Sequence, residues 1–377
     1  MRRALILINN TGIGGAERRF GRLFARMADA DADTVFVINA GLWRRLRDGG
    51  VVSGRERRVW RFAEPCGWLA EGVGLRGAPA FWLRKLDYLL FGFLLLARYG
   101  LAPRSVFHLV LGGAYVAFPL MLLRPGHRTL ISVVSTDLAQ MVGVPAALLL
   151  YRRALGRCAL IDALSEGIRA DLVRRGIPGE KIVVSEGSAV DTARFQPALK
   201  KQPWVVFAGR LVEEKNPVLF VEAMPTILRA VPTARIFLLG EGPLRPMVEQ
   251  ALERSGVRDA VTTGFLPDLV PIFGPARVFV SLQRQDNYPS QSLLEAMASG
   301  AATVATDVGL TWKLVDETTG IRVKPNPDDI AGAVIALLKE PARCERLGQS
   351  ARRLVMERHS EKGYRDYLES RYARLSA

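Results

Sequence analysis

The sequence has few of the residues that bind metals or form disulfides. Its 377 residues include only 3 cysteines and 3 histidines. Cys66, Cys158 and Cys344 lie far apart, which argues against a disulfide framework or a metal cluster and fits a reducing compartment. The acidic run DADAD (29–33) resembles an Asp-x-Asp metal site but lacks a preceding buried strand, so we interpret it as a solvated loop. We therefore expect no metal site.

Long hydrophobic runs are also missing. The most apolar segment, LDYLLFGFLLLA (86–97), has 12 residues and contains Asp87, whereas a membrane-spanning helix needs about 20. We predict a buried helix that lies near a membrane-facing surface; the alternative is an interfacial helix flanked by Arg84, Lys85 and Arg98. The N-terminal run ALILIN is too short for the apolar core of a secretory signal, so we expect none.

Acidic residues are scarce in the first half of the chain. Residues 1–200 contain 29 Lys and Arg against 16 Asp and Glu, whereas residues 201–377 contain 23 against 21. A basic surface attracts an anionic partner, which could be nucleic acid, an anionic membrane or a phosphorylated substrate. The alternative is an arginine-rich, solvated surface that has no partner.

A repeated strand–helix–strand pattern runs along the chain. The apolar run Leu5–Asn9, a glycine loop, a helix over 15–27 and a strand over 34–40 form a βαβ unit, which implies a parallel sheet. Further strands are expected in the first half at 106–111, 129–134 and 158–165. In the second half we expect strands at 204–209, 235–240, 261–265, 277–282 and 302–308, and helices at 217–231, 243–255 and 328–339.

This pattern predicts an α/β protein with two Rossmann-like domains. A polar, proline-containing linker at 191–203 joins a first domain, residues 1–195, to a second domain, residues 200–355, and residues 356–377 form a C-terminal helical tail. Ligands of such sheets bind at the carboxyl ends of the strands, and two domains that face each other create a cleft, which commonly holds the active site.

The first glycine loop, NNTGIGGAERRF (9–20), departs from the dinucleotide-binding fingerprint. Gly12 and Gly14 take the first two positions of G-x-G-x-x-G, but Glu17 stands at the third. No G-K-[ST] follows, so a Walker loop is absent too, and we expect no nicotinamide or flavin cofactor. The N-terminus of the following helix could still bind an anion, or the loop could be a plain turn.

Two cations follow the first strand of the second half, in AGRLVEEKNP (208–217). Arg210, as a fork, and Lys215, as a point charge, could converge on one anion such as a diphosphate. Glu213 and Glu214 leave open a neutralised surface cluster instead.

The stretch RQDNYPSQSLLEAMASG (284–300) predicts a loop and then a helix that starts near Pro289–Ser290 and ends at Gly300. Three N–H groups would lie free at the positive helix end and suit a phosphate: those of Ser290, Gln291 and Ser292. Glu295 shares one helix face with Gln291. Its carboxylate could accept hydrogen bonds from sugar hydroxyls, or it could be structural.

The order and spacing of these motifs resemble the retaining glycosyltransferases of family 4, the "glycosyl transferases group 1" type with the GT-B fold. The matching segments are GIGGAE, ALSEGIRADLVRRGIPGEKIVVSEGSAVDTARFQP (163–197), FAGRLVEEKNP, LLGEGPLRPMVE, TGFLPD and NYPSQSLLEAMASGAATVATDVG. They cover nearly the whole chain and are most specific in its second half. The resemblance implies two domains that face each other across a cleft, with the C-terminal helix crossing back to the first.

The resemblance also implies a role for each motif. Arg210 and Lys215 would bind the donor diphosphate, and Glu295 would bind the ribose; these three form the expected catalytic set. The donor sugar would lie against Asn287, Tyr288, Pro289, Ser290 and Gln291, next to Ser292. The base would lie against Gly240, Glu241, Gly242, Gly264, Phe265 and Leu266. Gly14 and Gly15 would shape the loop that meets the phosphate and the acceptor.

The chain departs from the family pattern at two places. Asn287 stands where the family often has Glu, and a first-domain T-x-H-[DE] motif is replaced by Ser135, Thr136 and Asp137. His108 lies on an earlier strand, and we interpret it as structural. These departures concern the sugar contacts, and an atypical or inactive member of the family is the alternative.

The sequence thus predicts a bacterial, metal-independent, retaining glycosyltransferase of cell-envelope polysaccharide synthesis. It would move a sugar from a UDP- or GDP-sugar to a glycolipid or to a polysaccharide or lipopolysaccharide precursor. It would be cytoplasmic and would contact the anionic inner face of the plasma membrane through its basic first half, with no nucleic-acid partner. A sugar epimerase or phosphorylase on the same plan, and a basic nucleic-acid-binding protein, are the alternatives.

Overall fold

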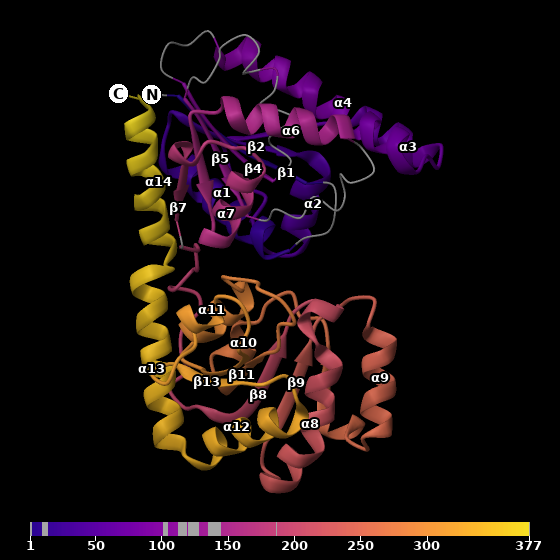
Figure 1. The fold of residues 1–377 in the computed structure, drawn as a ribbon, viewed down its shortest axis with the longest axis vertical. Coiled ribbons are helices and arrows are strands. Elements are labelled where there is room, and N and C mark those ends of the chain that lie inside the picture. Colours follow the sequence, from indigo (N-terminus) through magenta and orange to yellow (C-terminus); the bar gives the residue numbers. More distant parts are fainter. Residues whose placement is uncertain are drawn as a thin grey trace. The chain divides into compact units, whose positions relative to one another are not determined.

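The computed structural model describes residues 2–9, 14–100, 105–111, 119, 128–134, 145–185 and 187–376. The chain forms two compact units: Met1–Glu186 with Arg365–Ala377, and Gly187–Tyr364 (Figure 1). Residues 187–195, which the sequence analysis placed in the first domain, lie in the second unit. The Val190 N–H donates to the His359 carbonyl there, and Phe195 is buried in the core of that unit. The last residues return to the first unit, as the resemblance implied.

Within the described residues, the first unit has a seven-stranded parallel sheet with the order β3-β2-β1-β4-β5-β6-β7. The strands are β1 (Arg3–Ile8), β2 (Thr34–Asn39), β3 (Val59–Phe62), β4 (Val106–Leu111), β5 (Thr129–Val133), β6 (Leu160–Ala163) and β7 (Ile182–Val184). Five of them are the predicted apolar runs, which are buried on both faces as parallel strands require. The sequence analysis missed β3 and β7, which are only 4 and 3 residues long.

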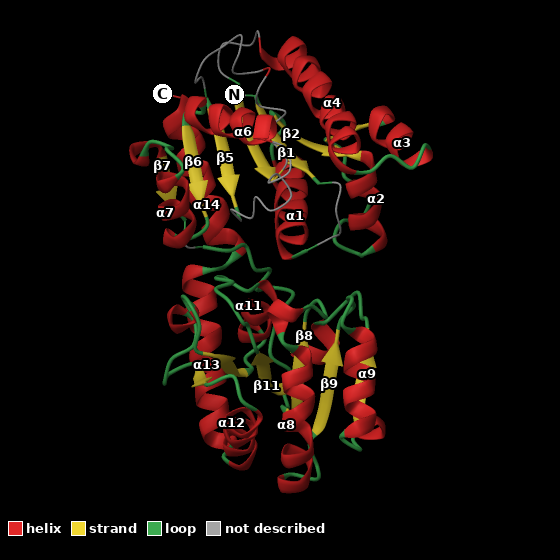
Figure 2. Cartoon of the chain, turned by 45° about the vertical axis from the view of Figure 1, so that its right-hand side comes forward, coloured by secondary structure: helices red, strands yellow, loops and turns green. Residues whose placement is uncertain are grey.

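Helices cover both faces of this sheet (Figure 2). They are α1 (Gly15–Ala30), α2 (Ala40–Asp48), α3 (Pro65–Gly72), α4 (Gly77–Leu95), α6 (Pro145–Arg157), α7 (Glu166–Arg174) and α14 (Glu361–Ser376). On α1, Phe20, Leu23, Phe24 and Met27 recur at spacings of three and four residues, and all four are buried. This amphipathic pattern is why the segment forms a helix against the sheet.

The apolar segment 86–97 is helical, but the prediction that it is buried is wrong for one of its faces. It lies in α4 and in a short π-helical extension, Leu96–Gly100. Phe91 stacks on Phe62 of β3 with ring centroids 3.9 Å apart, whereas Leu90 and Leu94 are exposed. In the described part of the chain, none of the helices is both long enough and apolar enough to span a bilayer.

The second unit has a six-stranded parallel sheet, in its described residues, with the order β10-β9-β8-β11-β12-β13. The strands are β8 (Gln202–Ala208), β9 (Arg235–Leu239), β10 (Val261–Gly264), β11 (Ala276–Ser281), β12 (Ala302–Thr306) and β13 (Gly320–Val323). The chain moves outward from β8 to β10, then restarts with β11 on the other side of β8. The strand order therefore reverses between β8 and β11, the point where such sheets bind ligands.

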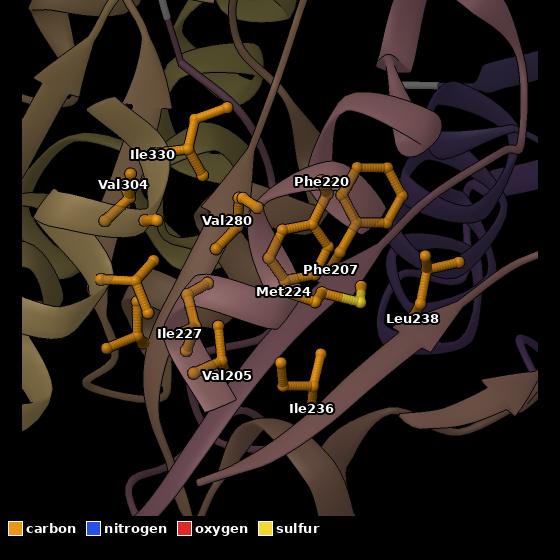
Figure 3. Close-up of a cluster of buried hydrophobic side chains, with 14 of the residues drawn as sticks. Val205, Phe207, Phe220, Met224, Ile227, Ile236, Leu238, Val280, Val304 and Ile330 are labelled. Carbon is orange, nitrogen blue, oxygen red and sulfur yellow. The ribbon is translucent and has the colours of Figure 1, made fainter. Parts of the chain in front are cut away.

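Four helices of the second unit agree closely with the predicted ones, whereas the short helix at 270–273 and most of the helix at 341–358 were missed. The helices are α8 (Pro217–Ala230), α9 (Arg245–Arg254), α10 (Val270–Phe273), α11 (Gln291–Ala298), α12 (Pro327–Lys339) and α13 (Pro341–Arg358). Phe207 of β8 and Phe220 of α8 stack in the core, among aliphatic side chains from neighbouring strands (Figure 3). The predicted tail 356–377 contains the end of α13 and all of α14.

A buried hydrogen-bond chain fixes α14 to the first sheet. His108 Nδ1 lies 2.6 Å from the Tyr372 hydroxyl, and His108 Nε2 lies 2.8 Å from Ser132 Oγ. Ser132 in turn donates to Asp162, which also accepts from Tyr367 of α14. Burial lowers the pKa of His108 to about 3, so the ring stays neutral. These contacts confirm that His108 is structural.

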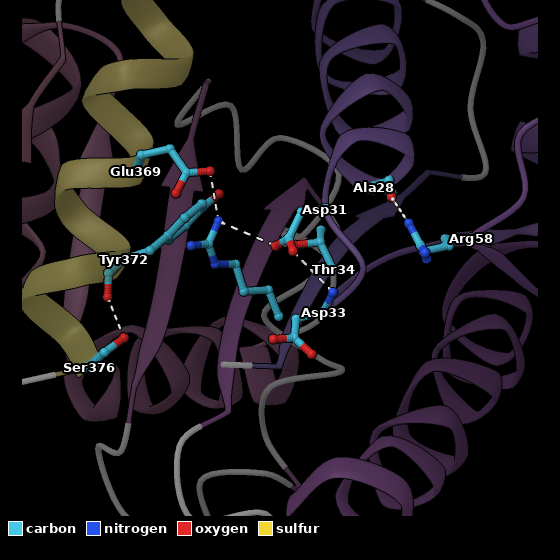
Figure 4. Close-up of polar contacts among 9 residues, drawn as sticks. Ala28, Asp31, Asp33, Thr34, Arg58, Glu369, Tyr372 and Ser376 are labelled. Atoms are coloured by element: carbon cyan, nitrogen blue, oxygen red, sulfur yellow. Dashed lines mark hydrogen bonds and ion pairs between the residues drawn. The ribbon is translucent and has the colours of Figure 1, made fainter.

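The acidic run near residue 31 also has a structural role. Arg3 of β1 contacts Asp31 at 3.9 Å and Glu369 of α14 at 2.7 Å (Figure 4). Thr34 donates to Asp31 at 2.6 Å. Hydrogen bonds from Thr34 and the Asp33 N–H, with the nearby Arg3 charge, outweigh burial and hold the pKa of Asp31 below its usual range.

Candidate functional site

The predicted donor-site residues of the second unit follow the carboxyl ends of four neighbouring strands. Arg210 follows β8, Glu241 follows β9, Phe265 follows β10, and the loop with Asn287 follows β11. Because all four strands are parallel, their carboxyl ends meet at one edge of the sheet. The structure therefore brings these loops to the edge where the strand order reverses.

The loops after β8 and β9 approach each other very closely. The Leu211 N–H donates to the Glu241 carbonyl at 2.8 Å, and the Leu244 N–H donates to the Leu211 carbonyl at 2.9 Å. Gly240 (φ 153°) and Gly242 (φ 159°) make this approach possible, since a Cβ would lie 1.8 Å from the Gly209 oxygen or 2.4 Å from the Leu211 oxygen. The LLGEGP motif is thus a device that packs two loop backbones together.

Lys215 is a partly buried cation that lies near Arg210. It ends a 3-10 turn (Glu213–Lys215), and Asn216 begins α8 with a left-handed φ of 54°. Burial, and then repulsion by Arg210, lower the pKa of Lys215 to about 8, while Glu214 acts in the opposite direction. Arg284 pairs with Glu213 at 3.3 Å, so the Glu213 carboxylate has a cationic partner other than Lys215. Two cations that repel each other suit an anionic ligand placed between them.

The first turn of α11 carries a buried hydroxyl whose oxygen makes no hydrogen bond in the described structure. Ser290 is the N-cap residue, is only 5% exposed, and its Oγ has no hydrogen-bond partner. The first intrahelical bond runs from the Leu294 N–H to the Ser290 carbonyl, so the amides before Leu294 point out of the helix end. An unsatisfied buried hydroxyl beside these amides, which include those of Gln291 and Ser292, indicates a place for a polar ligand.

Glu295 is held by a side chain one turn earlier. Gln291 donates to Glu295 Oε1 at 3.0 Å, and Ser188 donates to Gln291 Oε1 at 3.0 Å. Ser188 comes from the segment before β8 and was missed by the sequence analysis. No local motif marks it, because only the tertiary structure places it against α11.

The loop between β11 and α11 is anchored through Gln283. Thr306 donates to the Gln283 carbonyl at 2.7 Å, and Asn287 Nδ2 lies 3.4 Å from Gln283 Oε1. Asn287 therefore uses its amide as a donor, which a Glu at that position could not do. Tyr288, next to Pro289, carries the Lys313 ammonium 5.8 Å from its ring centroid.

The turn after β10 exposes two apolar side chains. Phe265 is 51% exposed and Leu266 is 38% exposed, and the Gly264 carbonyl accepts a hydrogen bond from the Gly240 N–H. The Glu241 side chain pairs with Arg245 at 2.6 Å. This end of the site thus has an apolar surface, which suits the flat face of a base.

In the first unit, the structure shows why Glu17 stands at the third position of the glycine loop. Gly14 is the N-cap and Gly15 the first residue of α1, and the Gly14 N–H donates to Glu17 Oε2 at 2.8 Å. Asn9 donates to the other oxygen of the Glu17 carboxyl group. The Glu17 carboxylate thus caps the N-terminus of α1. Gly12 and the segment Ser135–Asp137 lie outside the described residues.

Over the described part of the chain, the structure contains no group of three His, Cys, Asp or Glu side chains placed to hold a metal ion. Among the charged groups of the candidate site are Arg210, Lys215 and Glu295, with Lys313 beside the Tyr288 loop.

Comparison with known proteins finds glycosyltransferases among the similar ones. The family described as "Glycosyl transferases group 1" matches residues 202–340, which contain most of the second unit. Alpha-D-kanosaminyltransferase of Streptomyces kanamyceticus is 28% identical over 64% of this chain and 67% of its own length. A phosphatidylinositol N-acetylglucosaminyltransferase component from Arabidopsis thaliana is 28% identical over 43% of this chain and 38% of its own length. The chain thus aligns with well under half of that relative.

Solved structures extend the likeness to the whole chain. Alr3699/HepE of Anabaena, crystallised with UDP and glucose, superimposes with a TM-score of 0.72 at 14% identity, covering 97% of this chain and 99% of its own. Such a likeness identifies the fold. Both units together therefore have the architecture of the GT-B glycosyltransferases.

Proposed function

We propose, on the premise that the chain belongs to the glycosyl transferases group 1 family and is a glycosyltransferase, that its second unit binds a nucleoside-diphosphate sugar at the carboxyl edge of its sheet. The observation that carries this proposal is that Lys215 lies near Arg210 after β8, while the start of α11 follows the neighbouring parallel strand β11 at the same edge. Each of them favours negative charge, and a diphosphate is the part of such a donor that supplies it.

The reaction then follows from where charge develops. When the bond between the sugar and the diphosphate breaks, negative charge grows on the leaving phosphate. Arg210, Lys215 and the amides at the start of α11 would already be oriented toward that charge, so they would stabilise the transition state without reorganising. Because the protein's own cations would neutralise the diphosphate, we propose that the transfer needs no metal.

Glu295 would bind the donor rather than act as a nucleophile. Gln291 already donates to one of its oxygens, which fixes the carboxylate in an orientation suited to accept hydrogen bonds from ribose hydroxyls. We propose that the configuration is retained because the acceptor attacks the face that the diphosphate leaves. The leaving phosphate would then accept the proton of the attacking hydroxyl.

The first unit would bind the acceptor, which we propose to be a glycolipid or a polysaccharide precursor of the cell envelope. The phosphatidylinositol N-acetylglucosaminyltransferase relative acts, by its name, on a lipid acceptor, and the basic first half of this chain suits a phosphorylated or membrane-bound one. We also propose a cytoplasmic protein that contacts the inner face of a membrane peripherally, with UDP or GDP as the nucleotide and no nucleic-acid partner.

Thermal-shift measurements with UDP-, GDP- and ADP-sugars test the donor proposal. A ligand that binds only the folded state raises the midpoint of unfolding by an amount that grows with its concentration. Lys215→Ala and Glu295→Ala should each remove the shift and reduce sugar transfer at least a hundredfold, while far-UV circular dichroism stays unchanged. An unchanged transfer rate in both variants would refute the proposed site.

Asn287→Glu tests the sugar end of the same site. The substitution replaces an amide that donates to Gln283 with a carboxylate that only accepts, so we expect a changed preference among donor sugars or a changed kcat. If neither changes, Asn287 only supports the loop.

A further inference from the structure

The first unit carries an apolar surface that the proposed transfer reaction does not use. Eight large hydrophobic side chains between residues 68 and 94 are 38% to 61% exposed. They are Trp68, Leu69, Val73, Leu75, Leu86, Leu90, Phe93 and Leu94. This short segment holds half of all the exposed large hydrophobic residues in the described chain. Clustered apolar exposure of this kind marks an interaction surface.

The geometry of α4 explains how the surface arises. Tyr88, Phe91 and Leu95 face inward and are buried against the sheet. Four residues at helical spacing form a stripe on the outward side: Leu86, Leu90, Phe93 and Leu94. A helix that is apolar on two faces needs a covering for both, and the sheet covers only the inner one.

The helix α3 is held rigidly beside α4 (Figures 1 and 2). Asp87 of α4 is buried and accepts hydrogen bonds from the N–H groups of Cys66 and Gly67 at the start of α3. Arg84 pairs with Glu71 across the two helices at 3.6 Å. The exposed side chains of both helices therefore stand on one fixed frame, which we call the α3–α4 surface.

An arginine-lined hollow lies at the end of this surface. It has a volume of about 680 Å³ and opens at the amino ends of β1, β2 and β3, the edge opposite to the carboxyl ends. Its cations are Arg2, Arg57, Arg58 and Arg98, and Asp33 is the one acid among its described lining residues. Arg98 follows Leu94 by one helical turn, and its guanidinium lies 5.2 Å from the Trp60 ring centroid. Figure 4 shows that Arg58, one of these cations, donates to the Ala28 carbonyl.

We propose, resting on the peripheral membrane contact proposed above, that the α3–α4 surface docks the first unit onto an anionic phospholipid bilayer, with the arginine-lined hollow receiving the phosphate of a lipid headgroup. Apolar side chains of an interfacial helix lie at the boundary between headgroups and acyl chains, and the stripe of α4 has the length and exposure for this. Guanidinium groups match phosphate geometry, and the hollow stands one turn beyond the stripe, where a headgroup would lie. The charge of the hollow is what selects an anionic bilayer over a neutral one.

Vesicle flotation of the full chain without any donor sugar tests this proposal independently of the transfer reaction. The probes are phosphatidylcholine vesicles with and without phosphatidylglycerol. We expect binding to the anionic vesicles only. Leu90→Gln with Phe93→Gln should weaken binding at least tenfold, because both side chains are half exposed and would lose their apolar burial in the interface. Arg57→Gln with Arg98→Gln should weaken binding about twenty-fivefold, at about fivefold for each arginine.

Matched substitutions in the second unit serve as controls. Met247→Gln with Met356→Gln removes side chains of similar exposure, 54% and 49%, and Arg229→Gln with Arg353→Gln removes the same charge. Neither control should change vesicle binding. All variants are compared by their unfolding midpoint, which exposed substitutions should leave nearly unchanged.

Four results would overturn the proposal. The first is retained binding in the Leu90/Phe93 variant or the Arg57/Arg98 variant. The second is equal binding to neutral vesicles. The third is a protein that stays off vesicles but forms a dimer in light scattering that the Leu90/Phe93 variant abolishes, since the surface would then join two copies. The fourth is an unfolding midpoint that inorganic phosphate raises in a protein that does not bind vesicles. The ligand of the hollow would then be a soluble phosphate, and the bilayer would be excluded.

Discussion

At the scale of single residues, the candidate site is marked by groups that cost the folded chain stability. Lys215 keeps a charge in a place where burial and Arg210 oppose it, and the buried Ser290 hydroxyl has no hydrogen-bond partner among the described residues. Such groups persist where a ligand completes their interactions. Substituting Lys215 or Ser290 should therefore change the stability of the free protein and its affinity for the ligand in opposite directions.

Lys215→Met should stabilise the free protein and weaken donor binding. The pKa of Lys215 is lowered to about 8 from 10.5, so the unfolded chain binds more protons between these values and stability rises with pH across that window. At neutral pH the buried charge is a net cost, and Met removes it, raising the free energy of unfolding by up to about 3 kcal/mol. Denaturant titration of both proteins at pH 7 and pH 10 measures this. The difference between them should shrink at pH 10.

The same pKa predicts how donor binding depends on pH. Only the protonated lysine attracts the diphosphate, so the affinity of the wild-type protein for the nucleotide should fall as pH rises above about 8. Calorimetric titration between pH 7 and pH 9.5 should show this fall in the wild type, and a pH-independent, weaker affinity in Lys215→Met. A parallel fall in both proteins would assign the effect to another group.

Ser290→Ala separates ligand binding from helix capping. Ser290 Oγ makes no hydrogen bond in the described structure, so its loss should leave stability unchanged or raise it by up to about 1 kcal/mol, while donor affinity falls severalfold. Ser299→Ala is the matched control at the other end of α11, because Ser299 donates to the Glu295 carbonyl. The control should lose about 1 kcal/mol and keep its donor affinity. The same outcome for both serines would remove Ser290 from the site.

At the scale of elements, α14 depends on the polar chain that ties it to the first sheet. Because Ser132 gives its proton to Asp162, His108 Nε2–H donates to Ser132, and Nδ1 accepts from Tyr372. Each group in this hydrogen-bond chain, from Tyr372 through His108 and Ser132 to Asp162, therefore donates to the next. This arrangement requires a neutral His108 ring. A helix of this kind is held by a few directed contacts as well as by its apolar face.

Tyr372→Phe should cost the first unit about 1–3 kcal/mol, because it leaves the buried Nδ1 of His108 without a donor. Low pH should weaken the same contact between His108 and Tyr372. The folded-state pKa of His108 is about 3, against 6.5 for an exposed imidazole, so the stability that depends on a neutral ring is lost as pH falls below about 6.5. Thermal melts from pH 7 to pH 4.5 should show a smaller decline for His108→Gln than for the wild type. An equal decline would place the acid sensitivity elsewhere.

At the scale of the whole molecule, each unit has its own hydrophobic core. The clusters around Phe220 and Phe279 lie in the second unit, and the cluster around Phe91 lies in the first. The first unit is formed by two separate segments, Met1–Glu186 and Arg365–Ala377. The second unit is the continuous segment Gly187–Tyr364 between them. Because α14 supplies Tyr367 and Tyr372 to the first unit, that unit is completed only after the second has been made.

A fragment comprising residues 187–364 should fold alone and bind the nucleotide. It contains a complete sheet, both of its core clusters and the donor-site residues from Arg210 to Glu295. We expect a cooperative thermal transition and a midpoint raised by UDP or GDP. The complementary fragment, residues 1–186, lacks α14 and should be unfolded or aggregate. A fragment 187–364 that folds without responding to any nucleotide would contradict the assignment of the donor site to the second unit.

The sequence by itself determined the class of the fold and most of its second half. Continuous apolar runs identify parallel strands, since both faces of such strands are buried, and glycine and proline mark the ends of α11. The roles of the motifs from Arg210 to Glu295 are implied by the family resemblance, and their place in loops and a helix that follow strand ends agrees with it, since strand ends of a parallel sheet converge. Short strands such as β3 were missed because four residues carry too little pattern.

Only the tertiary structure decided how side chains remote in sequence meet. The contact between Ser188 and Gln291 spans 103 residues, and that between His108 and Tyr372 spans 264, distances at which no local periodicity operates. The same holds for the outer face of α4, since the sequence shows an apolar segment but not which of its faces the sheet covers. Burial is a property of packing, and packing is settled when the whole chain has folded.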